Sequence, residues 1–159
     1  MIGVAVLGST GSIGRSTLEV LRRQRDHFRV VALTCGRNRE EFAAQVAEWR
    51  PAYAGLALPG QDERWPCGPD VLVEAATHPD VGIVVNAVVG AAGLDATLAA
   101  LRLGKRVALA NKESLVMGGH LVEANLHPAS DGSSPRIGSG IGSAGFQPRP
   151  AALGSEGSA

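Results

Sequence analysis

The sequence predicts an α/β fold built on a doubly wound parallel sheet, incomplete at one edge and followed by a disordered C-terminal tail. Across residues 1–125, short runs of β-branched and apolar residues alternate with segments of helical periodicity. A glycine-rich loop joins the first apolar run to the first helical segment. Alternation of this kind is typical of parallel strands joined by right-handed helical crossovers. Ligands bind such sheets at the carboxyl ends of the strands, so functional residues are expected in the loops there.

The expected elements follow the apolar pattern in chain order. Residues 2–7 form a continuous apolar run that ends at Gly8, as expected for a strand buried on both faces. The first helix is expected over 16–25, because Leu18, Val20 and Leu21 recur at helical spacing. Further strands are expected at 28–34, 53–58, 83–89 and 106–110, and further helices at 40–49, 70–76, 94–103 and 114–124.

Charge and cysteine content exclude several classes of protein. Fifteen basic residues balance fifteen acidic ones, so neither nucleic acid nor an anionic membrane is an expected partner. The N-terminal apolar run is too short for a signal peptide or a membrane span. Cys35 and Cys67 have no metal-ligand spacing and form no disulfide framework. A reducing cytoplasm is therefore the expected compartment.

The composition changes at residue 126. Of the 34 residues in 126–159, 18 are Gly, Ser or Pro, and large apolar residues there are isolated. Such a segment buries too little apolar surface to offset the entropy of ordering it, about 1–2 kcal/mol per residue. We expect a disordered tail. It is either the product of a reading-frame error or truncation near 124–126, favoured by the Arg-rich composition of a GC-rich gene, or the end of a natural short protein.

The loop Gly8-Ser9-Thr10-Gly11-Ser12-Ile13-Gly14 follows the first strand. Its glycines allow backbone N–H groups to approach a phosphate, and the helix beyond adds the positive end of its dipole. The spacing GxxGxxG differs from the GxGxxG dinucleotide fingerprint, and the loop lacks the Lys of a P-loop. After a buried strand it predicts pyrophosphate binding in a Rossmann-like domain.

The end of the second expected strand indicates the cofactor. NAD-binding domains place a carboxylate there to bind the ribose 2′-hydroxyl, but this chain has Cys35-Gly36-Arg37-Asn38-Arg39. Guanidinium groups suit the 2′-phosphate of NADP, although two solvated arginines at a helix start would give the same pattern.

Cys35 could lie near the cofactor, but a small buried hydrophobe is the plainer interpretation.

Two further segments follow the glycine loop 8–14 in order: Asn86-Ala87-Val88-Val89-Gly90-Ala91-Ala92-Gly93-Leu94 and Leu109-Ala110-Asn111-Lys112-Glu113-Ser114-Leu115-Val116. Together the three segments resemble the family of 1-deoxy-D-xylulose 5-phosphate reductoisomerase over residues 1–124. The resemblance implies an NADPH-binding domain at 1–125. It also implies the family reaction, in which a ketose phosphate is rearranged and then reduced to 2-C-methyl-D-erythritol 4-phosphate for isoprenoid synthesis.

By the same resemblance, particular residues take family roles. Thr10, Gly11, Ser12 and Ile13 would hold the NADPH pyrophosphate, and Gly36, Arg37 and Asn38 would surround the 2′-phosphate. Asn111 and Glu113 would contact the nicotinamide half, although Asn111 could equally cap a helix, and Lys112 would bind the sugar-phosphate substrate.

The resemblance ends before the family's metal site. The family binds Mg or Mn through an Asp-Ser-Glu cluster, but residues 134–142 read Ser-Pro-Arg-Ile-Gly-Ser-Gly-Ile-Gly and contain no carboxylate. We therefore expect a fragment of the homodimeric family enzyme that binds NADPH and is inactive alone, with no catalytic or metal residue of its own. A non-enzymatic NADP-binding module or partner subunit is the alternative.

Overall fold

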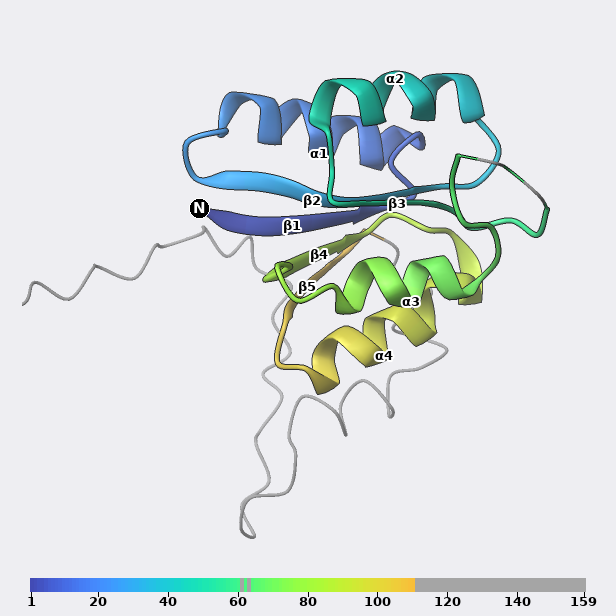
Figure 1. Ribbon diagram of the computed structural model, residues 1–159. Helices are drawn as coiled ribbons and strands as arrows, with labels where there is room; N and C mark the ends of the chain where they lie inside the picture. Colours follow the sequence, from blue (N-terminus) through green and yellow to red (C-terminus); the bar gives the residue numbers. More distant parts are fainter. Residues whose placement is uncertain (61, 63, 111–159) are drawn as a thin grey trace, which may run out of the picture. The chain divides into compact units, whose positions relative to one another are not determined.

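The computed structural model describes residues 1–60, 62 and 64–110, which form a three-layer α/β structure (Figure 1). Five parallel strands form one sheet in the order β3-β2-β1-β4-β5. The strands are β1 (Ile2–Leu7), β2 (Phe28–Cys35), β3 (Tyr53–Leu56), β4 (Ile83–Asn86) and β5 (Arg106–Leu109). The helices are α1 (Ser12–Arg23), α2 (Arg39–Trp49), α3 (Asp70–Thr77), the 3₁₀ turn η1 (Gly90–Gly93) and α4 (Leu94–Arg102). The expected doubly wound fold is thereby confirmed.

Helices α1 and α2 cover one face of the sheet, and α3 and α4 cover the other (Figure 1). Alternate residues of β1 supply the two cores: Val4 and Val6 pack toward α1 and α2, and Ala5 and Leu7 pack toward α3 and α4. A strand buried on both faces needs apolar side chains at every position. The continuous apolar run that predicted β1 therefore reflects its central place in the sheet.

One irregularity interrupts the pairing of β1 with β2. Val4 pairs with Val30, but Ala5 pairs with Ala32, so Val31 is an extra residue in β2. Val31 and Ala32 both pack in the core on the α3 and α4 side, which breaks the alternation expected of a regular strand. This bulge places Leu33 and Cys35 in the core beneath α1 and α2.

Several expected boundaries were wrong. Helix α1 begins at Ser12 instead of residue 16, because the glycine loop turns directly into the helix. Val20 was expected on its buried stripe but is 60% exposed, since it lies about 200° around the helix from Leu18. Strands β3 and β4 end at Leu56 and Asn86, two and three residues before their expected ends. None of the described helices has the length and apolar character needed to cross a membrane.

Asn86 ends β4 because its buried side chain bonds to the chain that follows. Its Nδ2 donates to the Gly93 carbonyl and to Thr97 Oγ1, both at 2.9 Å, and its Oδ1 accepts from the Val88 N–H at 3.1 Å. These bonds fix the turn from β4 into η1 and α4. The backbone after Asn86 is thereby drawn out of the sheet, although Val88 and Val89 suit a strand.

Gly14 sets how closely α1 approaches the end of β1. A Cβ at this position would lie 2.3 Å from the Gly8 carbonyl oxygen and 2.6 Å from Ser9 Cα. Both obstacles are backbone atoms and cannot rotate away. Only glycine therefore lets the first turn of α1 pack against the loop that leaves β1.

We expect Gly14→Ala to destabilise the fold by about 1–3 kcal/mol, because the added methyl group overpacks a backbone contact. Gly36→Ala is the matched control, since no described atom lies within 4 Å of its Cβ position and its backbone angle suits other residues. Urea unfolding of the 159-residue chain compares the two variants. Equal unfolding midpoints for Gly14→Ala and the parent would contradict the packing argument.

We expect Asn86→Ala to lower the free energy of unfolding by about 2–4 kcal/mol, because two buried polar groups and one part-buried N–H lose their partner together. Asn38→Ala provides a scale, since it removes one exposed helix cap and should cost about 1 kcal/mol. The same denaturant titration reports both values. A smaller loss for Asn86→Ala than for Asn38→Ala would be inconsistent with its role at the end of β4.

Candidate functional site

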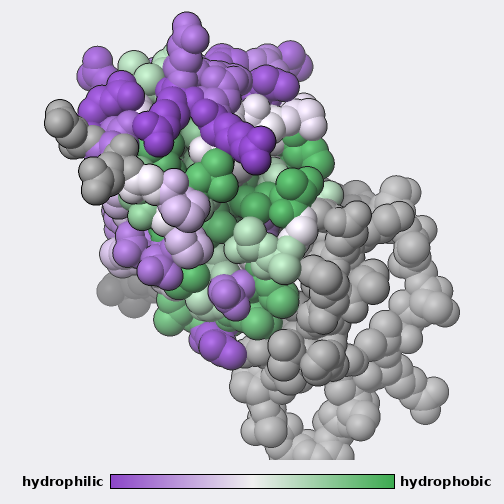
Figure 2. All heavy atoms as spheres, turned by 90° about the vertical axis from the view of Figure 1, so that its right-hand side faces the viewer, coloured by the Kyte–Doolittle hydropathy of each residue, from purple (hydrophilic) through white to green (hydrophobic). Residues whose placement is uncertain are grey.

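The loops that follow β1, β2 and β4 meet at the carboxyl-terminal edge of the sheet, where the strand order reverses between β1 and β4. The Gly8 and Ser9 N–H groups donate to the Thr34 carbonyl of β2 at 3.0 and 2.8 Å, and the Ala87 N–H donates to the Leu7 carbonyl at 3.0 Å. Figure 2 looks onto this edge: hydrophilic residues gather at the top, over α1 and α2, and hydrophobic residues lie across the middle. Such a switch point is where open α/β sheets bind ligands.

The glycine loop presents the amino end of α1 to this edge. Gly8 adopts a φ of +78°, and a Cβ there would lie 3.1 Å from the Ala87 carbonyl oxygen. The Gly11 N–H closes a turn onto the Gly8 carbonyl at 3.1 Å. Within the described residues no side chain caps α1, and its first turn carries no acidic residue. The loop therefore offers backbone donors and an uncompensated positive helix end to an anion.

The four residues predicted to hold pyrophosphate lie together in this loop. Thr10 is half-buried, whereas Gly11, Ser12 and Ile13 are exposed. The Ile13 side chain is 44% exposed although it is apolar. The structure thus brings the predicted set to one surface, with backbone N–H groups, hydroxyls and one apolar side chain available to a ligand.

The two arginines in the loop after β2 have different surroundings. Arg39 pairs with Asp62 at 3.3 Å, whereas the exposed Arg37 has no carboxylate partner among the described residues. Asn38 caps α2 by accepting from the Glu41 N–H at 3.2 Å, and its Nδ2 donates to the Glu41 carboxylate at 2.8 Å. Gly36 has open space around it in the described part of the chain. Arg37 is therefore the guanidinium that remains available to an anion at this loop.

Cys35 ends β2 directly beneath this loop and is 1% exposed. Burial raises the pKa of its thiol, which keeps the group protonated and unreactive near neutral pH. Its Sγ lies 3.6 Å from the Asn38 carbonyl oxygen. The interpretation of Cys35 as a small buried hydrophobe is confirmed.

Sequence reasoning missed a polar contact between α2 and the glycine loop. Gln45 is 8% exposed, and its Nε2 donates to the Ser9 carbonyl at 3.1 Å. Its neighbour Phe42 belongs to the apolar core, and Val46 and Trp49 pack against that core. The available signal was an amide within the buried stripe of an amphipathic helix, where a polar group requires a partner.

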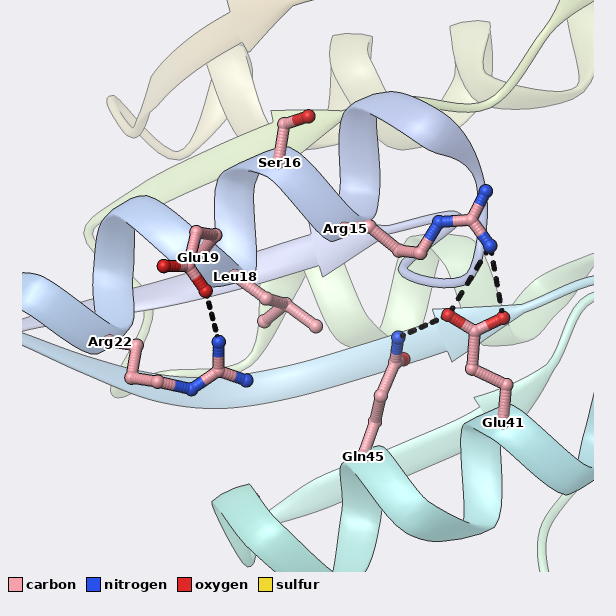
Figure 3. Close-up of a pocket in the computed structure, with 7 residues that line it drawn as sticks. All are labelled: Arg15, Ser16, Leu18, Glu19, Arg22, Glu41 and Gln45. Carbon is pink, nitrogen blue, oxygen red and sulfur yellow. Dashed lines mark hydrogen bonds and ion pairs between the residues drawn. The ribbon is translucent and has the colours of Figure 1, made fainter.

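A groove of about 550 Å³ lies between α1 and α2 (Figure 3). Its charged side chains neutralise one another. Arg15 pairs with Glu41 at 3.2 Å, and Arg22 pairs with Glu48 at 2.9 Å and with Glu19. The pKa of Glu48 is lowered, chiefly by its hydrogen bond from Arg22. These arginines are therefore less available to an anionic ligand than Arg37.

Three predicted site residues, Asn111, Lys112 and Glu113, lie outside the described residues, as do the tail at 126–159 and the domain boundary at 125. Among residues 1–60, 62 and 64–110, no group of three His, Cys, Asp or Glu side chains could hold a metal ion. The described part of the candidate site consists of the loops that follow β1, β2 and β4.

Comparison with known proteins points to one family. The family model of 1-deoxy-D-xylulose 5-phosphate reductoisomerase matches residues 4–119. The enzyme of that name from Ralstonia nicotianae is 49% identical over 136 residues, which is 76% of this chain and 34% of the relative. The enzyme from Symbiobacterium thermophilum is 45% identical over 77% of this chain and 35% of its own length.

Solved structures of the same family are also similar to this chain. A Zymomonas mobilis 1-deoxy-D-xylulose 5-phosphate reductoisomerase in complex with NADPH superposes with a TM-score of 0.73 and 41% identity, covering 80% of this chain and 36% of that one. A DOX-P reductoisomerase in complex with magnesium also gives 0.73, at 40% identity and 79% and 34% coverage. This chain spans about a third of the length of the relatives that it matches. On the family match and these identities, the chain belongs to the 1-deoxy-D-xylulose 5-phosphate reductoisomerase family.

Proposed function

We propose that this chain is the NADPH-binding part of an enzyme that rearranges and reduces 1-deoxy-D-xylulose 5-phosphate to 2-C-methyl-D-erythritol 4-phosphate. The observation that carries the proposal is the pairing of an uncapped helix end at the glycine loop with Arg37 after β2, which has no carboxylate partner in the described part of the chain. These two positive features suit the pyrophosphate and the 2′-phosphate of one dinucleotide. Family membership and the NADPH complex of the Zymomonas mobilis relative support it.

Different described residues bind the two phosphate groups of NADPH. Backbone N–H groups of Thr10, Ser12 and Ile13 face the pyrophosphate, Gly11 forms the turn between them, and glycines at 8 and 14 allow the close approach. Arg37 binds the 2′-phosphate, Gly36 leaves room for it, and Asn38 holds the start of α2 in place by capping it. When bound, NADPH supplies the hydride for the reduction.

The rest of the family reaction is proposed for residues beyond the described range. Asn111 and Glu113 would contact the nicotinamide half, and Lys112 would bind the sugar phosphate. One solved relative is a complex with magnesium, but we assign the metal no residues in the described part of the chain. The proposal also includes a homodimer in the cytoplasm that has no nucleic-acid or membrane partner. It divides the chain into a domain at 1–125 and a tail without catalytic residues.

We expect the 159-residue chain to bind NADPH more tightly than NADH, and Arg37→Ala to weaken NADPH binding about 10- to 100-fold. This range corresponds to the loss of about 1.5–3 kcal/mol from a hydrogen bond to a charged group. NADH affinity should change less than about twofold, because NADH lacks the 2′-phosphate. Arg39→Ala is the matched control, since Asp62 already pairs with that guanidinium. Titration calorimetry measures the affinities of the parent chain, Arg37→Ala and Arg39→Ala for NADPH and NADH.

Two outcomes would overturn the assignment of the 2′-phosphate. Equal affinities of the parent chain for NADPH and NADH would remove the need for a phosphate site at this loop. A larger loss of NADPH affinity in Arg39→Ala than in Arg37→Ala would assign the phosphate to the other guanidinium.

The glycine loop is tested by a substitution whose effects on stability and binding have opposite signs. Ser12→Asp places a carboxylate in the first turn of α1, which should stabilise the helix by about 0.3–1 kcal/mol. The same charge should repel the pyrophosphate and weaken NADPH and NADH equally, by about tenfold or more. Ser16→Asp adds the same charge one turn later and should weaken binding less. Tighter or unchanged binding by Ser12→Asp, measured beside its melting temperature, would refute the loop as the pyrophosphate site.

A further inference from the structure

Helix α2 contacts the glycine loop through one buried amide. Gln45 Nε2 donates to the Ser9 carbonyl at 3.1 Å and lies 3.5 Å from Glu41 Oε1. Figure 3 shows the Gln45 amide pointing toward the Glu41 carboxylate, which Arg15 holds from α1. Both neighbours of Nε2 are hydrogen-bond acceptors. The amide therefore has one favourable orientation, since the reverse would place Oε1 against two oxygens.

This amide is costly as a packing residue. Gln45 Oε1 and Ser9 Oγ are both buried without a hydrogen-bond partner among the described residues. Burial of an unpaired polar atom destabilises a fold, and an apolar side chain of similar length would avoid that cost. What Gln45 provides in return is one directional bond to the backbone of the glycine loop.

That bond fixes the direction of the next N–H group. In a trans peptide the C=O and the following N–H point in opposite directions, and the described chain contains no cis peptide. Because the Ser9 carbonyl points toward α2, the Thr10 N–H points away from α2. The Ser9 N–H is held in turn by the Thr34 carbonyl at 2.8 Å. Both backbone groups of Ser9 are therefore pinned, one by β2 and one by Gln45.

We propose that Gln45 is a positioning residue for the pyrophosphate site: its bond to the Ser9 carbonyl aims the Thr10 N–H at the bound phosphate. This inference rests on the proposed NADPH-binding function. Gln45 itself touches no ligand, since it lies on the α2 side of the loop. It acts by limiting the rotation of the Ser9–Thr10 peptide.

The test replaces Gln45 by Met, which has a similar length and no donor. We expect Gln45→Met to weaken binding of both NADPH and NADH about tenfold, and to leave the affinity for adenosine 2′-monophosphate within about twofold. The mononucleotide engages only the Arg37 loop, so a general loss of structure would weaken it as well. Val46→Ala is the control: Val46 packs in the core beside Gln45, and its truncation should lower stability without changing either affinity.

The outcomes separate this inference from the function beneath it. If the parent chain does not bind NADPH, the proposed function fails. If the parent binds NADPH and Gln45→Met binds it equally well, only the positioning role fails. Should Gln45→Met not fold, amide NMR of the parent decides: inorganic pyrophosphate should shift the Thr10 N–H resonance, and an unmoved Thr10 resonance beside shifted Ser12 and Ile13 resonances would overturn the inference.

Discussion

The contact between Gly14 and the Gly8 carbonyl is the constraint on which the ligand-binding edge depends. It brings the first turn of α1 against the loop that leaves the central strand, so that the positive helix end opens at the switch point of the sheet. Gly8 needs its left-handed backbone, at a φ of +78°, to begin that loop. Any larger side chain at Gly14 would move the helix outward, and the loop N–H groups would no longer converge.

Pairing of charges decides which positive groups remain available. The arginines of α1 that face α2 are matched by Glu19, Glu41 and Glu48, and Asp62 takes Arg39. Exposed ion pairs of this kind add little stability, but each one removes a guanidinium from competition for an anion. Among the described residues, Arg37 and the uncapped end of α1 differ from these arginines because no carboxylate is paired with them. In the proposed function, selectivity for a phosphorylated ribose depends on which arginines already have partners.

The sequence predicted the sheet well because its central strands β1 and β2 are buried on both faces and carry continuous apolar runs. The sequence predicted element boundaries less well where contacts between distant residues determine them. The early start of α1 depends on a glycine contact across the loop, and the early end of β4 depends on bonds from Asn86 to Gly93 and Thr97. The resemblance assigned the 2′-phosphate to Arg37, but the ion pair that occupies Arg39 could not be predicted, since its partner comes from a loop more than twenty residues later. Gln45 was missed because helical periodicity indicates which face is buried and says nothing of a bond to Ser9.

The most direct test of this account is phosphorus NMR of NADPH bound to the 159-residue chain, titrated with acid. The 2′-phosphate and the pyrophosphate give separate signals, so each predicted contact is observed on its own. The account predicts that the bound 2′-phosphate loses its second charge at a lower pH than in free NADPH, where a phosphate monoester has a pKa of about 6, because the Arg37 guanidinium favours the dianion. It also predicts that the pyrophosphate signals shift on binding. An unchanged 2′-phosphate titration in the bound nucleotide, or unshifted pyrophosphate signals, would contradict it.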